Sequence, residues 1–540
     1  MIFLKMSIMK RFFSSIFWGA FVLSILWSQT VCANGTIIYV DADANGLNNG
    51  TSWTDAYTDL QSALTEQAVG NEIWVAEGTY KPTTTTMQQM SFVMIPGINM
   101  YGGFAGNETY REHRNWLVNE TILSGDIGEV GNIWDNSYHV VIGTVETILD
   151  GFTITCGLGY GGGPFGDSGG GMLNENVNPI VSNCKFIENR ASWGGGIYNS
   201  RCNPTITNCI FANNYADNGG GMYNFESNPL LEKNTFIDNI SEEGGGLFNN
   251  YESQPILYDC TFERNTASAA GGGVGNLFSS PTIINCKFID NESDGGGREI
   301  CNRMTSNPIL INCSFTGTSH TVVGEDAMFN FRDSSPTIIN CTYSEFGICI
   351  GNLDNSNPSL SNCILWGEDL PIGPLIVDSY SVTQVTHSNI QGGWPGEGNI
   401  DQDPLFMDSD NGDLRLTAGS PCIEAGDNNS VPADSLDLDG DGNTSEKIPF
   451  DIAGRQRIRD GNCDGQTIVD MGSFEFYLIG DLKIDCKVNF PDVAIFAKNW
   501  LKTNCSPANN WCSGSDIDRD GDADFADLSE IINNWLEESL

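Results

Sequence analysis

The sequence predicts an all-β fold, a parallel β-helix solenoid, because a repeat of about 25 residues runs through the middle of the 540-residue chain. Prolines recur every 22 to 28 residues, and five residues after each stands a cysteine or, once, an asparagine. Each unit consists of short β-type runs bounded by turn residues, without helical length or spacing. Such a unit cannot bury its apolar face alone, so we expect it to wind once and stack on its neighbour. The prolines are Pro179, Pro204, Pro229, Pro255, Pro281, Pro308, Pro336 and Pro358, followed by Cys184, Cys209, Asn234, Cys260, Cys286, Cys313, Cys341 and Cys363.

Residues that recur at one register are expected to form ladders along the rod. An asparagine row would satisfy buried amides between coils, with ligand contact as the alternative. We expect the cysteine row to be a column of small buried thiols, because no Cys-x-x-Cys pair occurs, with disulfides between coils as the alternative. The asparagine row is Asn189, Asn214, Asn239, Asn265 and Asn291.

Residues 1–33 have the pattern of a secretory signal peptide. Lys5, Lys10 and Arg11 precede an apolar run at 16–27, and a small-residue cleavage site follows at 31–33. Lipidation of Cys32 is the alternative. No later segment approaches 18 uninterrupted apolar residues, so we expect no transmembrane segment in the mature chain.

The charge balance is strongly acidic. The chain has 69 acidic and 25 basic residues, which gives a formal net charge of -44 and an isoelectric point of about 4.1. Nucleic acid is therefore not an expected partner. With 40% hydrophobic residues the chain has enough apolar material for a core, so wholesale disorder is not expected.

Residues 34–177 are expected to form an N-terminal cap and the first coils. Leu60, Ala63 and Leu64 follow helical spacing, so a short helix within 53–66 would cover the open edge of the first coil. The phrases Ile38-Tyr-Val-Asp and Trp74-Val-Ala-Glu-Gly-Thr-Tyr resemble secreted bacterial right-handed parallel β-helix proteins of the pectin-lyase-like superfamily. The resemblance covers most of residues 35–477 and implies a right-handed solenoid in a secreted, extracellular or cell-surface-associated bacterial protein.

Regular repeats are expected at 178–366, and final coils with a closing segment at 367–477. Ser420-Pro-Cys-Ile-Glu-Ala-Gly-Asp and Val469-Asp-Met-Gly-Ser-Phe-Glu resemble the closing segments of such surface proteins. Between them, Asp437, Asp439 and Asp441 form an Asp-x-Asp-x-Asp-Gly run. No acid stands at the twelfth position, so we expect at most a weak Ca²⁺ site there, with a solvated acidic turn as the alternative.

Residues 478–540 contain the clearest chemistry, a loop with the oxygen spacing of a Ca²⁺ site at 516–527. Gly521 stands at the sharp turn, and acids occupy positions 1, 3, 5, 9 and 12. Three acids would bind the ion directly, one through its backbone carbonyl, one through water, and the last would close the loop. In that order they are Asp516, Asp518, Asp520, Asp522, Asp524 and Asp527.

The same pattern occurs 35 residues upstream, and each loop leads into an amphipathic helix that ends in Asn-Trp-Leu. The upstream ligand positions are Asp481, Asp485, Asn489 and Asp492. This duplicated loop and helix, an EF-hand-type pair, resembles type I dockerins. The resemblance implies Ca²⁺ as cofactor and a cohesin-like protein, or another surface partner, bound through residues 478–540.

Two departures from the dockerin pattern are expected to matter. Lys483 occupies a ligand position and Cys486 replaces the turn glycine, so the first site should be weaker or distorted. Positions 10 and 11, which help dockerins choose the cohesin, are Phe490-Pro491 and Phe525-Ala526 instead of small hydroxyl residues. A disulfide between Cys505 and Cys512 would clip the insertion between the two repeats.

The sequence identifies no catalytic residue. The residues four positions after the first five members of the cysteine row form a second row, which stacking would place along one face of the rod. This row would contact a glycan or remain a solvated surface. We therefore expect a binding or scaffolding β-helix protein related to polysaccharides and docked through a dockerin-like module. The alternatives are a polysaccharide lyase or glycoside hydrolase targeted by that module, and an adhesin-like spacer. The row consists of Glu188, Asn213, Asp238, Arg264 and Asp290.

Overall fold

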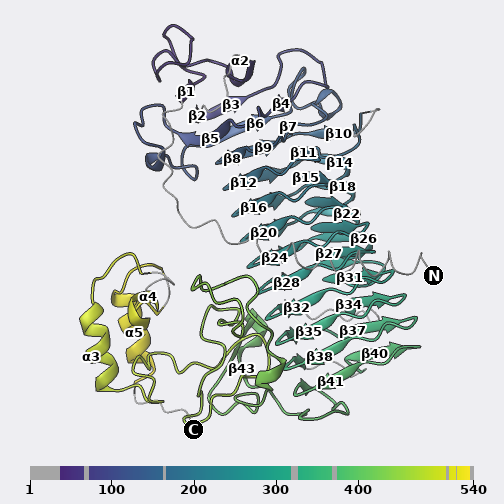
Figure 1. Cartoon of the computed structure of the whole chain (residues 1–540), viewed down its shortest axis with the longest axis vertical. Coiled ribbons are helices and arrows are strands. Elements are labelled where there is room, and N and C mark those ends of the chain that lie inside the picture. Colours follow the sequence, from purple (N-terminus) through teal and green to yellow (C-terminus); the bar gives the residue numbers. More distant parts are fainter. Residues whose placement is uncertain are drawn as a thin grey trace, which may run out of the picture.

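The computed structural model of the chain describes residues 37–65, 72–161, 166–317, 326–367, 374–505, 510–517 and 520–535. The predicted signal peptide, residues 1–33, lies outside the described residues. The described chain winds into a solenoid of parallel strands whose coils stack along one axis (Figure 1). The predicted parallel β-helix is thereby confirmed.

Two long parallel sheets, here called A and B, run along the solenoid with 13 and 12 strands. Sheet A contains β1 (Ile37–Val40), β2 (Glu72–Ala76), β5 (Asn99–Phe104), β8 (Ile148–Asp150), β12 (Ile180–Ser182), β16 (Thr205–Thr207), β20 (Leu230–Glu232), β24 (Ile256–Tyr258), β28 (Thr282–Ile284), β32 (Ile309–Ile311), β35 (Thr337–Ile339), β38 (Ser359–Ser361) and β41 (Gln384–Thr386). Sheet B contains β3 (Gly78–Tyr80), β6 (Thr121–Ser124), β9 (Phe152–Thr155), β13 (Lys185–Ile187), β17 (Ile210–Ala212), β21 (Thr235–Ile237), β25 (Thr261–Glu263), β29 (Lys287–Ile289), β33 (Ser314–Thr316), β36 (Thr342–Ser344), β39 (Ile364–Trp366) and β42 (Asn389–Ile390).

Two further parallel sheets, C and D, complete the walls with 11 and 6 strands. Sheet C contains β4 (Phe92–Val93), β7 (Val141–Ile142), β11 (Met172–Glu175), β15 (Ile197–Ser200), β19 (Met222–Phe225), β23 (Leu247–Asn250), β27 (Val274–Leu277), β31 (Ile300–Arg303), β34 (Asp326–Phe331), β37 (Ile348–Leu353) and β40 (Ile376–Ser379). Sheet D contains β10 (Leu158–Gly159), β14 (Arg190–Trp193), β18 (Tyr215–Asn218), β22 (Ile240–Glu243), β26 (Thr266–Ala270) and β30 (Glu292–Ser293).

The core is a set of stacked apolar columns from sheets A, B and C. Sheet B contributes a column of aromatic rings whose neighbours lie 4.2 to 5.1 Å apart, centroid to centroid, and nearly parallel. All of these rings are fully buried, so the column excludes water along the rod. The column consists of Phe186, Phe211, Phe236, Phe262, Phe288, Phe315 and Tyr343.

The predicted asparagine ladder is present. Each side chain donates from Nδ2 to Oδ1 of the next asparagine over 2.8 to 3.2 Å, and the same Oδ1 accepts the backbone N–H of the coil before it. A second ladder, which we did not predict, runs through sheet C at 2.8 to 2.9 Å and ends on Asp378. It consists of Asn174, Asn199, Asn224, Asn249, Asn276, Asn302, Asn330 and Asn352.

The predicted column of buried thiols is also present. Its cysteines are buried and free, and they form no disulfide with one another. Burial raises the pKa of Cys363 to about 12, so the thiol stays neutral. Asn234 fits the column because its Oδ1 accepts the Cys209 backbone N–H at 2.9 Å and its Nδ2 donates to the Ile206 carbonyl at 2.8 Å.

A short helix lies at the N-terminal end of the rod, as predicted. The helix α2 (Leu60–Thr65) buries Leu60, Ala63 and Leu64 and contacts β1 and β4. Three 3₁₀ turns, η1 (Arg111–His113), η2 (Ile133–Asp135) and η4 (Asn428–Ser430), lie in connecting segments, and η3 (Ser409–Asn411) precedes β44. None of the described helices is long and apolar enough to cross a membrane.

The closing segment folds back along the side of the last coils (Figure 1). Amide groups at successive turns between sheets A and B donate to its carbonyls, Asn312 to Phe450 at 2.9 Å and Asn340 to Asp470 at 3.2 Å. Val431, Ile448 and Val469 pack against Ile284 and Ile311. The segment also contains the antiparallel pair β43 (Phe406–Asp408) and β44 (Asp413–Leu416).

The described C-terminal region contains α3 (Phe490–Asn499), α4 (Asn510–Gly514) and α5 (Phe525–Asn533). The α3 and α5 helices contact each other, and their core residues Val488, Phe496 and Ile531 are continuous with Leu416 and Met471 of the closing segment. A disulfide joins Cys505 to Cys512, as predicted.

The first asparagine ladder predicts that the loss of a single side-chain amide destabilises the fold. Asn214 makes four hydrogen bonds to the neighbouring coils, so we expect Asn214→Ala to lower the free energy of unfolding by about 3 kcal/mol or more, because buried partners lose their bonds. Urea unfolding followed by circular dichroism measures this. Asn213→Gly is the matched control, since Asn213 is exposed and has the left-handed φ of 54° that glycine tolerates. Equal unfolding midpoints for the two variants would contradict a stabilising ladder.

The first ladder ends at a buried acid. Asn291 donates to Glu299 Oε2, and burial raises the pKa of Glu299 from 4.5 to about 8. Between pH 4.5 and about 8, Glu299 holds a proton in the folded protein that it has released in the unfolded chain. This group therefore makes the stability of the fold decrease as the pH rises. We expect Glu299→Gln to unfold like wild type near pH 4 but at higher urea than wild type at about pH 9. The control is Glu292→Gln, an exposed acid, which should change neither midpoint.

Candidate functional site

The predicted outer row does form one column on the rod. Each of its residues follows a strand of sheet B in matching register and lies in the left-handed region, with φ of 50° to 56°. Glu188, Asn213 and Arg264 are exposed, whereas Asp238 and Asp290 are half-buried. The register continues through Gly317 to Glu345, which the sequence reasoning missed. The same rule, four residues after Cys341, would have found it.

The middle of the row is occupied by its own ion pair. Arg264 donates from Nε and Nη2 to the two carboxylate oxygens of Asp238 at 2.9 and 3.0 Å, and it also contacts Glu263. Hydrogen bonding to Asp238 raises the pKa of Arg264. These two predicted glycan contacts therefore satisfy each other across neighbouring coils.

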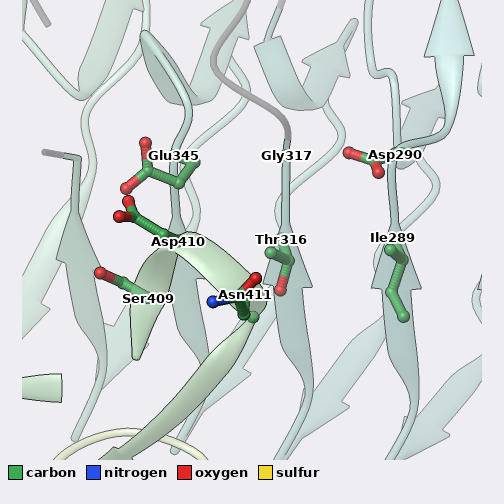
Figure 2. A pocket seen from close by; sticks show the side chains of 9 residues that line it. Ile289, Asp290, Thr316, Gly317, Glu345, Ser409, Asp410 and Asn411 are labelled. Atoms are coloured by element: carbon green, nitrogen blue, oxygen red, sulfur yellow. The ribbon is translucent and has the colours of Figure 1, made fainter. Parts of the chain in front are cut away.

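At the end of the row nearest the C-terminal coils, its residues line a pocket of about 400 Å³. Asp290 and Glu345 come from the rod, and Asp410 comes from η3 in the closing segment. Figure 2 shows the Glu345 and Asp410 carboxylates on one side of the pocket and Asp290 on the other. Thr316, Ser409 and Asn411 supply further polar groups. Three carboxylates in one pocket can hold a hard cation, hydrogen-bond sugar hydroxyls, or act as an acid and base pair.

In the C-terminal region, the first loop brings three predicted ligands together. Carboxylate oxygens of Asp481, Asp485 and Asp492 lie within 4.8 Å of one another, and Asp492 is fully buried. Asn489 donates its backbone N–H to Asp492 at 2.8 Å. Lys483 Nζ lies 2.7 Å from Asp485 Oδ2, so a lysine ammonium supplies positive charge at a position where the second loop has an acid.

The second loop repeats the geometry of the first. The Gly521 N–H donates to Asp516 at 3.1 Å, as the Cys486 N–H donates to Asp481 at 2.7 Å. Cys486 has a left-handed φ of 62°, so it adopts the hand of the turn that Gly521 supplies in the other loop. Asp516 and Asp527 are buried, Asp520, Asp522 and Asp524 belong to the described loop, and the predicted ligand Asp518 lies outside the described residues.

The two loop and helix units pack against each other through aromatic side chains. Phe490, at the start of α3, packs against Trp535 at 5.1 Å, and Phe525, at the start of α5, packs against Trp500 at 4.8 Å. Both pairs are edge to face. Phe490 and Phe525 nevertheless remain 78% and 73% exposed, which leaves much of both rings accessible.

Further acidic groups lie in the closing segment. Asp437, Asp439 and Asp441, the predicted weak site, place carboxylate oxygens within 4.8 Å of one another, and all three are at least partly exposed. Asp439 also lies near Asp434 and Glu446. Asp434 is almost fully buried, and its Oδ1 has no hydrogen-bond partner among the described residues. Burial raises the pKa of Asp434, with a further contribution from its acidic neighbours.

Another acidic group was not predicted from the sequence. Glu424, Asp460 and Asp464 place carboxylate oxygens within 4.8 Å of one another. Asp460 begins an Asp-x-Asn-x-Asp-Gly run, a signal that could have identified the loop. A disulfide joins Cys463 of this run to Cys486 of the first C-terminal loop, so the closing segment and the C-terminal region are covalently linked.

Comparison with known proteins concerns the rod. The family model "Right handed beta helix region" matches residues 168–296. This part of the chain is a right-handed β-helix. No curated protein sequence gives a significant match.

Solved structures similar to the chain are low in sequence identity. A pectate lyase, Pel9A, matches with 14% identity and a TM-score of 0.46 over 83% of this chain and 98% of its own. A rhamnogalacturonan lyase matches with 13% identity and a TM-score of 0.38 over 69% and 91%. PfbA, a surface adhesin of Streptococcus pneumoniae, matches with 9% identity and a TM-score of 0.32 over 58% and 85%.

Proposed function

We propose that this protein is an exported polysaccharide-binding β-helix rod, attached to a cohesin-like or other surface partner through a Ca²⁺-dependent, dockerin-like C-terminal module. The observation that carries the proposal is the pair of matched acidic loops, each leading into a helix that packs on the other. Carboxylates as buried as Asp492, Asp516 and Asp527 are costly unless positive charge compensates them. Ca²⁺ would supply that charge.

The exposed rings of Phe490 and Phe525 support docking by this module. They occupy equivalent places at the starts of α3 and α5, and both stay accessible although their edges pack on tryptophans. Paired exposed aromatic rings favour a partner with an apolar surface. Export is supported by the two disulfides, which persist in oxidising compartments.

A glycoside hydrolase or polysaccharide lyase is the second candidate, and the pocket in Figure 2 favours it. Asp290, Glu345 and Asp410 line that pocket, and glycoside hydrolases use pairs of carboxylates as acid and base or as acid and nucleophile. The same carboxylates would also bind sugar hydroxyls without cleavage. Product release separates the two functions.

Calcium binding is tested by calorimetric titration and melting of the mature protein with Ca²⁺ and with chelator. We expect saturating Ca²⁺ to stabilise the fold, by about 3 kcal/mol at a hundredfold excess over the dissociation constant. Asp516→Asn keeps an acceptor for Gly521 but removes a ligand charge, so it should abolish the tighter site. Asp217→Asn, an exposed acid outside the loops, is the control. Binding unchanged by Asp516→Asn would refute the assignment.

Loop 1 offers a gain-of-function variant. Lys483→Asp replaces the ammonium beside Asp485 by the acid that loop 2 has at this position. We expect Ca²⁺ to bind the first loop about tenfold more tightly, because the charge that competes with the ion is removed and a ligand is added. A weaker first site in this variant would show that the lysine is not what limits it.

Polysaccharide function is tested by incubating the mature protein with acidic and neutral polysaccharides and following retention and product release together. For a binding rod we expect retention without products. If products appear, Glu345→Gln and Asp410→Asn should abolish them, whereas Glu188→Gln, an exposed acid of the same column outside the pocket, should not. Products that depend on Glu345 or Asp410 would replace the binding proposal by the enzyme.

A further inference from the structure

Exposed aromatic side chains gather at one corner of the rod, the turn that leads from sheet C into sheet A. From β11 onward, the residue directly after each sheet C strand lies in the left-handed region, with φ of 49° to 56°, in nine successive coils. Three of the nine are aromatic and exposed: Tyr251 at 52%, Phe278 at 46% and Tyr380 at 89%. The column is Asn176, Arg201, Glu226, Tyr251, Phe278, Met304, Arg332, Asp354 and Tyr380.

Conformation alone does not account for these residues. Left-handed φ is costly for bulky side chains and mild for asparagine. At the turn from sheet A to sheet B the chain mostly uses asparagine for the same conformation, with Lys233, Asp259 and His387 as the exceptions. The asparagines are Asn183, Asn208, Asn285, Asn312, Asn340 and Asn362. At three positions of the turn from sheet C to sheet A it places large rings that stay 46% to 89% exposed. Backbone strain retained for rings that are this exposed favours a function for them.

The rings border an open cleft of about 440 Å³. Phe278 lies at one end and Tyr380 at the other, four coils further along the rod, which is about 19 Å at ~4.8 Å per coil. Arg332, Asp333 and Asp354 line it between them. Asn355 donates to Asp333 at 2.5 Å, so part of this polar lining is held in place.

Beyond Phe278 the aromatic surface continues along the rod. Tyr251 lies 6.4 Å from Phe278 and 5.1 Å from Phe225, measured between ring centroids. Rings therefore follow the rod axis in successive coils instead of forming a compact apolar patch. An elongated ligand that repeats along its length matches this arrangement better than a compact one.

The chemistry of the cleft identifies the ligand class. A pyranose ring has an apolar C–H face that packs on an aromatic ring and a rim of hydroxyls that need donors and acceptors, which matches aromatic ends with carboxylate, amide and guanidinium groups between them. Two acids against one base line the cleft, in a chain of net charge -44, so a polyuronate would be repelled. We propose that this cleft binds an uncharged polysaccharide chain lying along the rod, with sugar rings stacked on Phe278 and Tyr380.

This inference rests on the proposed polysaccharide-binding function and locates it away from the acidic pocket. The test uses affinity electrophoresis of the mature protein in gels containing galactomannan, xyloglucan or hydroxyethyl cellulose, with polygalacturonate as the charged probe. Phe278→Asn and Tyr380→Asn remove the rings but suit the left-handed backbone. We expect each variant to bind about tenfold more weakly while melting at or above the wild-type temperature. Tyr215→Asn, an exposed tyrosine on β18 of sheet D, is the control and should bind like wild type.

Each outcome decides the proposal. Weaker retention of both cleft variants, with unchanged melting and an unaffected control, supports it. If the wild-type protein is retained and the cleft variants are retained equally, the cleft is wrong and polysaccharide binding elsewhere on the rod stands. Retention by polygalacturonate alone likewise overturns the cleft and leaves the proposed function intact. If no polysaccharide retains the wild-type protein, both the cleft and polysaccharide binding are overturned.

Discussion

The hydrogen bond between equivalent asparagine side chains of neighbouring coils is the interaction on which the rest of the structure depends. Each coil must turn sharply inside a dry interior, where unpaired amides are costly. The Asn189 to Asn291 ladder pairs those amides with the next coil and with backbone groups at once. Because every coil then repeats the same geometry, the rings from Phe186 to Tyr343 stack, and the outer residues fall into columns.

The two proposed sites on the rod lie on different outer columns. The column after sheet B carries acids and leads into the pocket of Glu345 and Asp410, whereas the column after sheet C carries exposed rings. A solenoid with a fixed interior can vary its outer turns freely, since each outer side chain contacts little except its neighbours in the same column. This variation occurs at the left-handed turns, where the chain accepts strained residues such as Phe278.

The C-terminal module is held by a shared core and a disulfide instead of by stacked coils. Its small core is continuous with that of the closing segment, and the disulfide from Cys463 to Cys486 fixes the first acidic loop to that segment. The second loop has no such covalent link in its described part, and Gly521 stands where Cys486 does in the first. The two loops therefore share one turn geometry while differing in tether and in the charge at Lys483.

The solenoid, the first asparagine ladder and the thiol column could be predicted from the sequence, because residues spaced by one coil are superposed whenever coils stack. The short N-terminal helix could be predicted from the helical spacing of Leu60, Ala63 and Leu64. The sequence also predicted the pairing of Cys505 with Cys512, which lie close in the chain. The tertiary structure alone decided that the closing segment folds back along the rod, through contacts such as that between Asn340 and Asp470, 130 residues apart. Only the structure shows that Asp410 and Glu345 line the same pocket and that Asp238 forms an ion pair with Arg264. It also shows that Phe278 and Tyr380 border one cleft. The physical reason is that a local repeat fixes what stacks within the solenoid, whereas contacts between distant segments depend on where the chain goes after the repeat ends.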